Sequence, residues 1–472
     1  MILLYIIYVL GVIWSVFNIL LYGNRPARSI GWLLIVITIP IIGVIFYIIF
    51  GINRKKFKFF TLNFNAKRRL YDLRHKGESI ENFSHKFNSE KFAKLGHLMK
   101  KSSGFPAVEG NKVSVLDTGK NTFEEIFKEV SNAKKFIHIQ YYIIEEGELL
   151  SELIKRCKQK LKEGVEVRIL YDAIGSNNLR AKQIKDLKNC GAEIFPILPI
   201  KLNTILSTLN YRNHRKILVI DGTVCFTGGV NISDKYVNEN TELGIWDDFH
   251  LKIEGIAVDH LHRVFIKDFY FASNKELLND TYLPNQSKKG NSLVQIVAGG
   301  PDLKYSSILQ QYTMMIHCAQ KSVCIENPYF IPNKILLETI KMAVLRGVDV
   351  KIMVPEKNDS RIAKYSMYAN FEDLLETGAK IYTLKNNFSH SKLIVIDEEI
   401  ASIGSGNFDY RSFEHNYEIN TILYDQKIAK NLSDHFKSNM SKCNALNYDT
   451  YMKRSLKTKL LEGAAKILSP LL

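Results

Sequence analysis

Two copies of one motif carry residue types suited to phosphoryl transfer: a histidine, a lysine two positions later and an aspartate seven positions later. The candidate catalytic residues are the members of the two copies: His214, Lys216, Asp221, His390, Lys392 and Asp397. A glycine-rich turn follows each copy and holds the candidate phosphate-binding and supporting residues: Gly229, Asn231, Ser405 and Asn407. One copy could arise by chance, but two copies in register, each on an apolar strand, indicate a functional site.

The spacing of the motif explains why these residue types suit a phosphodiester. Residues i and i+2 of an extended strand project from one face, so each histidine and its lysine point the same way. Two converging pairs would neutralise the phosphate, and the asparagines would add hydrogen-bond donors. One neutral histidine attacks phosphorus while the other, protonated, protonates the leaving oxygen. Since the ammonium groups supply the positive charge, we expect neither a metal nor another cofactor.

Four acidic residues accompany the two motifs in different roles. Asp221 and Asp397 lie at an odd offset from their histidines, on the opposite strand face, so a structural role is expected for them. A histidine that attacks must be held in one tautomer by a partner on its other ring nitrogen. Each half supplies one acid downstream of its motif, and we assign these two, Asp248 and Glu418, as histidine-orienting residues.

The elements that must position the motifs repeat along the chain with an offset of about 180 residues. In each half, glycines end helices and short apolar strands follow, which is the pattern of βαβ units in a parallel-leaning sheet. We predict an α/β fold of two pseudo-symmetric lobes, mixed sheets flanked by helices, at residues 112–273 and 292–448. Residues 274–291, which are polar, are the expected linker.

Two uncharged stretches, residues 2–22 and 30–51, precede the lobes. Each is long enough to cross the hydrocarbon core of a membrane. A short polar connector separates them, so residues 1–52 are predicted to form a two-helix transmembrane hairpin. A cleaved signal peptide is disfavoured, because no charged leading region is present and a second apolar stretch follows at once.

Positive charge is concentrated after the hairpin, in a basic juxtamembrane linker predicted over residues 53–111. Nine basic residues and one acidic residue lie from Arg54 to Lys76, and their net charge of +8 is half of the +16 of the whole chain. The positive-inside rule then predicts a multi-pass membrane protein with cytoplasmic lobes. Residues 449–472 alternate lysines with large apolar residues, which predicts an amphipathic tail either on the membrane or docked on a lobe.

The composition excludes several classes of protein. With 46% hydrophobic and 24% charged residues, the chain is neither disordered nor fibrous. The excess of 64 Lys and Arg over 48 Asp and Glu requires an acidic partner: nucleic acid, an anionic membrane or a phosphorylated substrate. Because so much of the excess directly follows an apolar hairpin, we expect an anionic lipid and no nucleic acid. The six scattered cysteines have no metal-ligand spacing.

The doubled motif resembles the phospholipase D superfamily, whose two HKD motifs form one active site. More narrowly, nearly the whole chain is similar to the bacterial cardiolipin synthase family, and the residues that carry this resemblance are 24–26, 47–51, 213–216, 227–231, 409–413 and 468–472. The resemblance implies phosphatidyl transfer between two phosphatidylglycerols, with glycerol released, at a bacterial plasma membrane. It also implies His214 as the nucleophile and His390 as the acid and base. The chain departs from the pattern at Asp247, where an arginine is expected, which affects headgroup contacts.

Other activities stay open at this point. A phospholipase D-like hydrolase, or a phosphatidyltransferase with another alcohol acceptor, would use the same motifs, because water and alcohols attack the same intermediate. A nucleic-acid enzyme would use the basic cluster on phosphates, but the position of that cluster after an apolar stretch argues against it. A non-catalytic membrane scaffold is disfavoured because both histidines and both lysines are present. The oligomeric state is not indicated by any motif.

Overall fold

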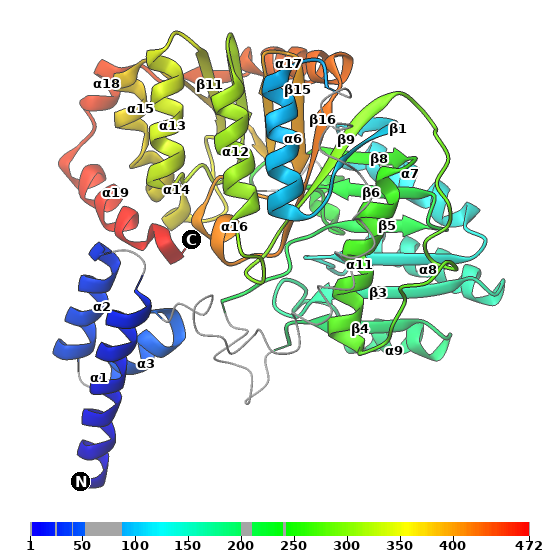
Figure 1. Ribbon diagram of the computed structural model, residues 1–472, viewed down its shortest axis with the longest axis horizontal. Coiled ribbons are helices and arrows are strands. Elements are labelled where there is room, and N and C mark those ends of the chain that lie inside the picture. The colour runs from blue at the N-terminus through cyan, green and yellow to red at the C-terminus, as the bar shows by residue number, and fades with distance from the viewer. Residues whose placement is uncertain are drawn as a thin grey trace. The chain divides into compact units, whose positions relative to one another are not determined.

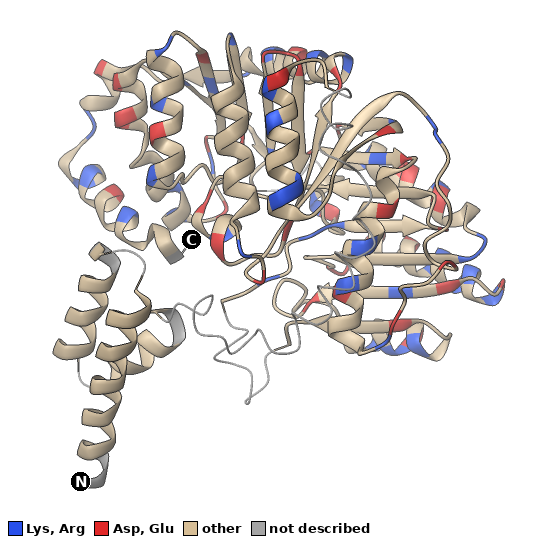
Figure 2. Cartoon of the chain, viewed as in Figure 1, with Lys and Arg blue, Asp and Glu red and all other residues tan. Residues whose placement is uncertain are grey.

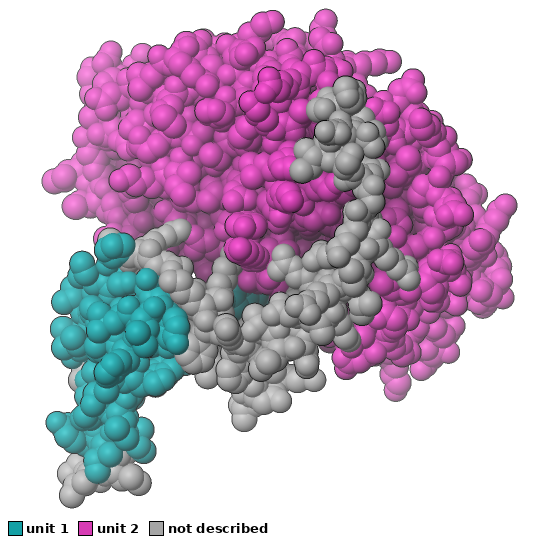
Figure 3. All heavy atoms as spheres, in the orientation of Figure 1, with its two compact units in different colours: residues 1–78, 200–211 teal, residues 79–199, 212–472 magenta. Residues whose placement is uncertain are grey.

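The computed structural model describes residues 2–23, 26–39, 41–51, 87–199, 210–238 and 242–471. The chain divides into two compact units (Figure 3): residues 1–78 with 200–211, and residues 79–199 with 212–472. The basic cluster between Arg54 and Lys76 and the connector residues Asn24 and Arg25 lie outside the described residues.

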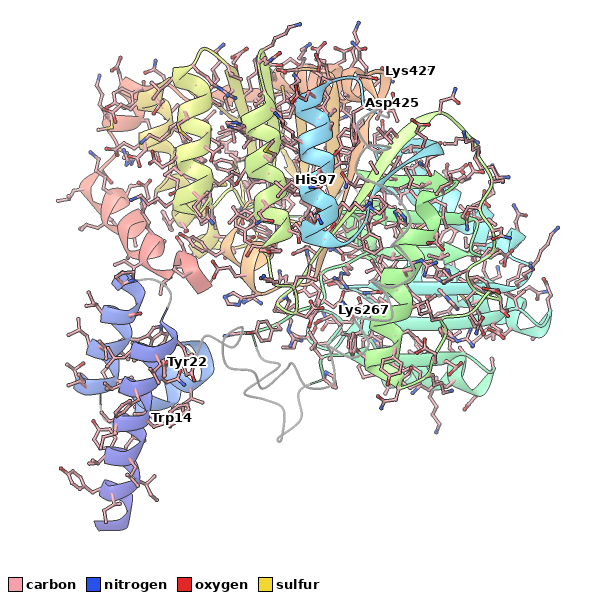
Figure 4. All side chains as sticks on the ribbon, in the orientation of Figure 1. Trp14, Tyr22, His97, Lys267, Asp425 and Lys427 are labelled. Carbon is pink, nitrogen blue, oxygen red and sulfur yellow. The ribbon has the colours of Figure 1, made fainter. Side chains whose placement is uncertain are left out.

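The first unit contains short and long apolar helices. They are α1 (Ile2–Tyr22), α2 (Pro26–Thr38), α3 (Ile42–Phe46) and a π-helix (Tyr47–Gly51). Apart from Arg28, α1 and α2 contain no charged residue (Figure 2). Among the described residues, only the α1 segment Tyr5–Tyr22, which bears Trp14 (Figure 4), is long and apolar enough to cross a membrane.

The second apolar stretch differs from the predicted continuous helix over residues 30–51. It is divided between α2, α3 and the π-helix, with the interruption after Thr38. The proline at position 40 explains the interruption, because proline lacks a backbone N–H and disfavours helical geometry in the residue before it. The divided segments pack on α1 and on each other: the Tyr47 hydroxyl donates to Asn18 Oδ1 (2.8 Å), and the Tyr47 ring meets Trp32 edge-on.

The second unit is built on one 15-stranded sheet. The strands of the first lobe are β1 (Ala107–Leu116), β2 (Phe136–Tyr141), β3 (Glu166–Asp172), β4 (Glu193–Ile197), β5 (Ile217–Ile220), β6 (Val224–Gly228) and β8 (His250–Glu254). Those of the second lobe are β9 (Ser292–Gly299), β10 (Ser322–Glu326), β11 (Asp349–Pro355), β12 (Lys380–Leu384), β14 (Leu393–Ile396), β15 (Ile400–Gly404), β16 (Glu418–Tyr424) and β17 (Cys443–Ala445).

The strand order repeats between the lobes and confirms the predicted mixed α/β architecture. The first lobe runs β4-β3-β2-β5-β6-β8-β1, and the second runs β12-β11-β10-β14-β15-β16-β9, with β17 added at its edge. In each lobe the first three strands of this order, β4-β3-β2 and β12-β11-β10, are parallel to one another. The strands that follow them pair antiparallel. Strands β1 and β9 pair antiparallel at the centre, so the lobes are related by a pseudo-two-fold axis and share one continuous sheet.

Helices cover the faces of the sheet (Figure 1). They are α7 (Gly119–Asn132), α8 (Glu148–Lys162), α9 (Ala181–Asn189) and α11 (Ala257–Ser273) in the first lobe, and α6 (Glu90–Ser103), α12 (Ser307–Cys318), α13 (Lys334–Leu345), α14 (Arg361–Tyr368), α15 (Phe371–Thr377), α16 (Tyr410–Glu414), α17 (Gln426–Met440), α18 (Tyr448–Met452) and α19 (Leu456–Leu468) around the second. Short strands β7 (Ile245–Asp247) and β13 (Asn387–Ser389) pair with each other outside the main sheet.

The lobes are joined by a common core and by polar contacts. One hydrophobic cluster contains Leu251 of the first lobe and Leu423 of the second, both buried. Lys267 on α11 (Figure 4) forms an ion pair with Asp302 (2.9 Å), in the loop after β9. Because the two lobes share a core, the site between them is held by packing rather than by a flexible linker.

Candidate active site

The two motifs lie at equivalent places in the two lobes. His214 and Lys216 directly precede β5, and His390 and Lys392 directly precede β14, both central strands of four β-branched or leucine residues. These strands are apolar throughout because they are covered on both faces. All four motif side chains are buried. The short extended segments before the strands therefore bring the polar side chains to a rigid, water-poor site.

Each histidine is paired with a carboxylate from the opposite lobe. His214 Nδ1 lies 2.9 Å from Glu418 Oε2, and His390 Nδ1 lies 2.7 Å from Asp248 Oδ2. The sequence predicted these two acids as orienting residues, and the structure places both beside a histidine. Neither active-site half is complete within its own repeat.

Backbone pairing explains why the carboxylates cross. The His214 N–H donates to the carbonyl of Tyr417 (2.9 Å), the residue before Glu418. The His390 N–H donates to the carbonyl of Asp247 (2.7 Å), the residue before Asp248. Each histidine segment is thus hydrogen-bonded to the segment that bears the partner acid. Asp247 accepts a hydrogen bond from Asn387 Nδ2 through its carboxylate (3.1 Å).

The two lysines lie beside the histidines and share their buried environment. Lys216 Nζ donates to the His214 carbonyl (2.8 Å), and Lys392 Nζ lies 2.9 Å from His390 Nδ1 and 3.8 Å from Asp248 Oδ2. Burial, reinforced by the charge of Lys392, lowers the pKa of Lys216 to about 7. Burial also lowers the pKa of Lys392 to about 8, although Asp248 opposes the shift. A bound anion would offset this penalty, because a nearby negative charge favours the protonated ammonium.

The two orienting carboxylates differ in their surroundings. Besides His214, Glu418 accepts hydrogen bonds from Ser405 Oγ (2.5 Å), Ser412 Oγ (3.0 Å) and Asn416 Nδ2 (3.2 Å). Burial alone would raise the pKa of Glu418, but His214, Lys216 and Ser405 hold that pKa below its usual value. This carboxylate is therefore a permanently charged acceptor at neutral pH.

Asp248 has fewer partners in the part of the chain that the structure describes. Its Oδ1 accepts from the N–H of Phe249 (2.8 Å), and burial raises its pKa to about 7 despite the two lysines. Gly229 occupies the position that Ser405 has in the other repeat, and a Cβ there would lie 2.1 Å from Asp248 Oδ1. The first turn thus cannot offer the hydroxyl that the second turn gives to Glu418.

The asparagines of the two turns lie within the site. Asn231 accepts from the Ile143 N–H (3.3 Å) and donates to the Tyr236 hydroxyl (3.2 Å), which is itself 3.1 Å from His390 Nδ1. The Asn407 N–H donates to Ser412 Oγ (3.0 Å), and within the described residues its buried Oδ1 has no hydrogen-bond partner. A polar group of a substrate would satisfy that atom.

Aromatic residues that the motif analysis did not identify complete the walls. The Tyr142 ring stands edge-on to His214 with 4.7 Å between ring centroids, and the Trp246 ring lies 5.5 Å from His390. The Tyr236 hydroxyl is hydrogen-bonded to His390 Nδ1. Tyr142 has a counterpart in the second half, Tyr329, whose ring stands edge-on to His390 with 6.4 Å between ring centroids. Tyr236 and Trp246 have no counterpart of the same type, so the repeat does not reveal them.

The two motif aspartates lie apart from the histidines, where each begins a turn after its strand. Asp221 accepts from the backbone N–H groups of Lys134, Lys135 and Phe136. Asp397 accepts in the same way from residues 320–322, with Lys91 as an additional partner (3.0 Å). Both take left-handed backbone, with φ of 52° and 55°. Although they belong to the candidate catalytic set, their contacts are structural, as the odd offset predicts.

Asp397→Ala is expected to lower the free energy of unfolding by about 3 kcal/mol, because three backbone N–H groups in partly buried hydrogen bonds lose their acceptor and alanine disfavours positive φ. Chemical denaturation of the purified variant measures this loss. Glu338→Ala, at an exposed position on α13, is the control and should change stability by less than about 0.5 kcal/mol. A variant as stable as the parent but inactive would instead assign Asp397 to the chemistry.

Comparisons with known proteins agree with this geometry. The family model "Cardiolipin synthase, PLD-like domain" matches residues 126–269 and 312–440, more than half of the chain, and "Phospholipase_D-nuclease N-terminal" matches residues 10–51. The cardiolipin synthase of Geobacillus sp. (strain WCH70) is 38% identical, over 98% of this chain and 92% of its own length. The major cardiolipin synthase ClsA of Bacillus subtilis (strain 168) is 37% identical, over 100% and 99%.

A solved structure shows the same fold at lower identity. The phosphatidylserine synthase of Haemophilus influenzae Rd KW20 superposes with a TM-score of 0.61 at 18% identity, over 80% of this chain and 100% of that one.

Proposed function

This chain belongs to the cardiolipin synthase family of the phospholipase D superfamily, and from that premise we propose that it transfers a phosphatidyl group from one phosphatidylglycerol to another and releases glycerol. The observation that carries the proposal is the crossed site, in which two histidine–carboxylate pairs and two lysines from both lobes are buried together. Such a site offers a nucleophile, an acid and positive charge for one phosphodiester.

In the first step, His214 Nε2 attacks the phosphorus of the donor lipid. The bond from phosphorus to the glycerol headgroup oxygen breaks, and His390 Nε2 gives a proton to that oxygen. Free glycerol leaves, and a phosphatidyl-histidine remains on His214. The ammonium groups of Lys216 and Lys392 neutralise the non-bridging oxygens as charge develops on them.

In the second step, a headgroup hydroxyl of another phosphatidylglycerol enters. His390, now neutral, takes the hydroxyl proton while the oxygen attacks phosphorus, and the bond to His214 Nε2 breaks. The product is cardiolipin, and both histidines return to their starting protonation states. Asn231 and Asn407, with the turn residues Gly229 and Ser405, support the phosphate site.

The unequal carboxylates support this division of roles. Glu418 remains charged, so it holds the Nδ1–H of His214 and leaves Nε2 with a free lone pair for attack. It also stabilises the positive ring that forms when phosphorus is bound. Burial raises the pKa of Asp248 to about 7, while burial and the charge of Lys392 lower the pKa of its partner His390 well below the usual value. The negative charge of a bound phosphodiester favours the protonated form of His390, which is the form that gives a proton to the leaving oxygen.

The lysines predict how activity depends on pH. A lysine carries its charge below its pKa and loses that charge above it, and burial lowers the pKa of Lys216 to about 7 and the pKa of Lys392 to about 8. The value of kcat/KM, which reports the free enzyme, should therefore fall as pH rises through 7 to 8. Rates in phosphatidylglycerol vesicles between pH 5.5 and 10 measure this. A plateau extending to pH 9.5 would contradict it.

The protein is membrane-associated, and we propose that it is a multi-pass protein of the bacterial plasma membrane with cytoplasmic lobes. Helix α1 supports one crossing, and the apolar stretch at residues 30–51 precedes the basic cluster. Alkaline phosphatase fused after residue 24 should be active, and a fusion at the C-terminus inactive. The reverse pattern would contradict this orientation.

Product analysis tests the proposed activity. The purified full chain is incubated in phosphatidylglycerol vesicles, and lipids and released headgroup are measured by mass spectrometry. We expect cardiolipin and glycerol in equal amounts. Phosphatidic acid as the only lipid product would contradict the proposal and assign a hydrolase.

A further inference from the structure

The C-terminal helix α19 carries an exposed apolar face that the chemistry does not use. Leu456, Leu460 and Ile467 are 73%, 65% and 79% exposed. Their spacings of four and seven residues place them on one side of the helix, and we call these three residues the outer face of α19. In Figure 1 this helix is the red one nearest the C-terminus.

The opposite side of α19 is fixed to the second lobe. Ala465 and Glu462 are buried, and Glu462 accepts a hydrogen bond from Arg454 Nε (2.8 Å), which also bridges to Glu372 on α15 (2.6 Å). Just after the helix, Ser469 Oγ is hydrogen-bonded to Ser366 Oγ of α14 (2.6 Å). The helix is thus docked on the second lobe, which was one of the two predicted alternatives for the tail. Its outer face points away from the lobe.

Positive charge borders the outer face on both sides. The helical spacing places Lys457 on one flank and Lys459 and Lys466 on the other. Figure 2 shows basic residues in blue on this helix. The only acidic residue within α19 is Glu462, which is buried and paired with Arg454. The exposed Leu461 and Leu468 extend the apolar surface beyond Lys457. An exposed apolar helix surface that carries lysines and no exposed acid is the pattern of a helix that lies at a membrane surface.

A second exposed apolar surface in the same lobe lacks this pattern. On α13, Ile335, Met342 and Leu345 are 58%, 57% and 75% exposed. The exposed Glu338 lies among them, three residues after Ile335 and four before Met342. Glu338 forms an ion pair with Lys341 (3.5 Å), so this stripe carries a compensated pair of charges in its middle and no net positive charge there. Helix α13 therefore provides a matched comparison.

We propose that the outer face of α19 is a membrane-docking surface whose partner is the anionic leaflet of a phospholipid bilayer. Leu456, Leu460 and Ile467 enter the boundary between headgroups and acyl chains, and Lys457 and Lys459 extend along their stems to the phosphates. Lys466 instead donates to the Ala369 carbonyl of the lobe (3.2 Å). Charge complementarity favours this partner over a protein, because lysines on both flanks match a continuous negative surface. The contact lies outside the catalytic residues and goes beyond the proposed function.

Fluorescence quenching in the full chain tests the contact without requiring turnover. A genetically encoded environment-sensitive fluorophore replaces Leu460, or Met342 as the comparison, and each protein is reconstituted in phosphatidylglycerol-rich nanodiscs. Brominated lipid should quench the Leu460 probe at least threefold more than the Met342 probe, and replacing phosphatidylglycerol by phosphatidylcholine should reduce that quenching. If the Leu460 probe is shielded from iodide but is not quenched by brominated lipid, another protein covers this face. If iodide reaches the probe fully, the face is exposed to water. Either result overturns the proposal.

Substitution provides a second measurement. The triple variant Leu456→Gln, Leu460→Gln and Ile467→Gln should lower kcat/KM at least tenfold in vesicles of dilute phosphatidylglycerol. It should keep parental activity on short-chain phosphatidylglycerol dispersed in detergent, which shows that the fold and the chemistry are intact. The α13 variant Met342→Gln with Leu345→Gln should match the parent in both assays. Equal losses in the two variants, or a loss of the triple variant in detergent as well, would contradict the proposal.

Discussion

His214→Ala is expected to lower cardiolipin formation by roughly 10⁴-fold or more, because removing the nucleophile removes the covalent route altogether. His390→Ala should lower overall turnover to a similar degree, since the acid and base act in both steps. Steady-state rates alone therefore cannot separate the two histidines, and the distinction needs a substrate that does not require the acid.

A phosphatidyl ester of p-nitrophenol supplies that distinction. Its leaving group departs without protonation, so His390→Ala should release one equivalent of p-nitrophenolate per enzyme and then stop at the phosphatidyl-histidine. His214→Ala should release none above the uncatalysed rate. Stopped-flow absorbance measures the burst. A full burst from His214→Ala would reverse the two roles.

Glu418→Gln is expected to slow the burst by roughly 10³-fold, because the amide neither fixes the Nδ1–H tautomer of His214 nor balances the positive ring. Asp248→Asn should slow the same burst by less than about tenfold, since it acts through His390 and the activated substrate does not need that proton. Both substitutions keep the side-chain shape, and thermal unfolding verifies that each variant is folded.

The two effects are diagnostic because the carboxylates cross between lobes. If each acid served the histidine of its own repeat, Asp248→Asn would give the large loss of burst rate and Glu418→Gln the small one. That outcome, or equal losses, would contradict the pairing of His214 with Glu418 at 2.9 Å.

The sequence predicted the members of the site better than their pairing. The spacing of His214 and Lys216, repeated at His390 and Lys392, is visible because it is local and occurs twice. The crossing of Asp248 to the second lobe depends on backbone contacts between segments more than 140 residues apart, and no local pattern encodes it. The difference between the two turns is visible in the sequence as Gly229 and Ser405, but its effect on the two carboxylates arises only in the folded site.

The fold was predicted to a similar extent. The repeated strand and helix pattern predicted two mixed α/β lobes, since periodicity and glycine positions are local signals. The joining of the lobes into one 15-stranded sheet follows from the pairing of β1 with β9, which is a long-range contact without a periodic signature. The second helix of the predicted hairpin is instead divided into shorter helices.

The proposed mechanism attaches the phosphatidyl group to a single atom, His214 Nε2. The most direct measurement is to quench wild-type enzyme within one turnover of phosphatidylglycerol at alkaline pH, digest it, and locate the adduct by peptide mass spectrometry. We expect a phosphatidyl group on the peptide that contains His214 and none on the peptide that contains His390. An adduct on His390, or turnover with no covalent adduct at either histidine, would contradict it.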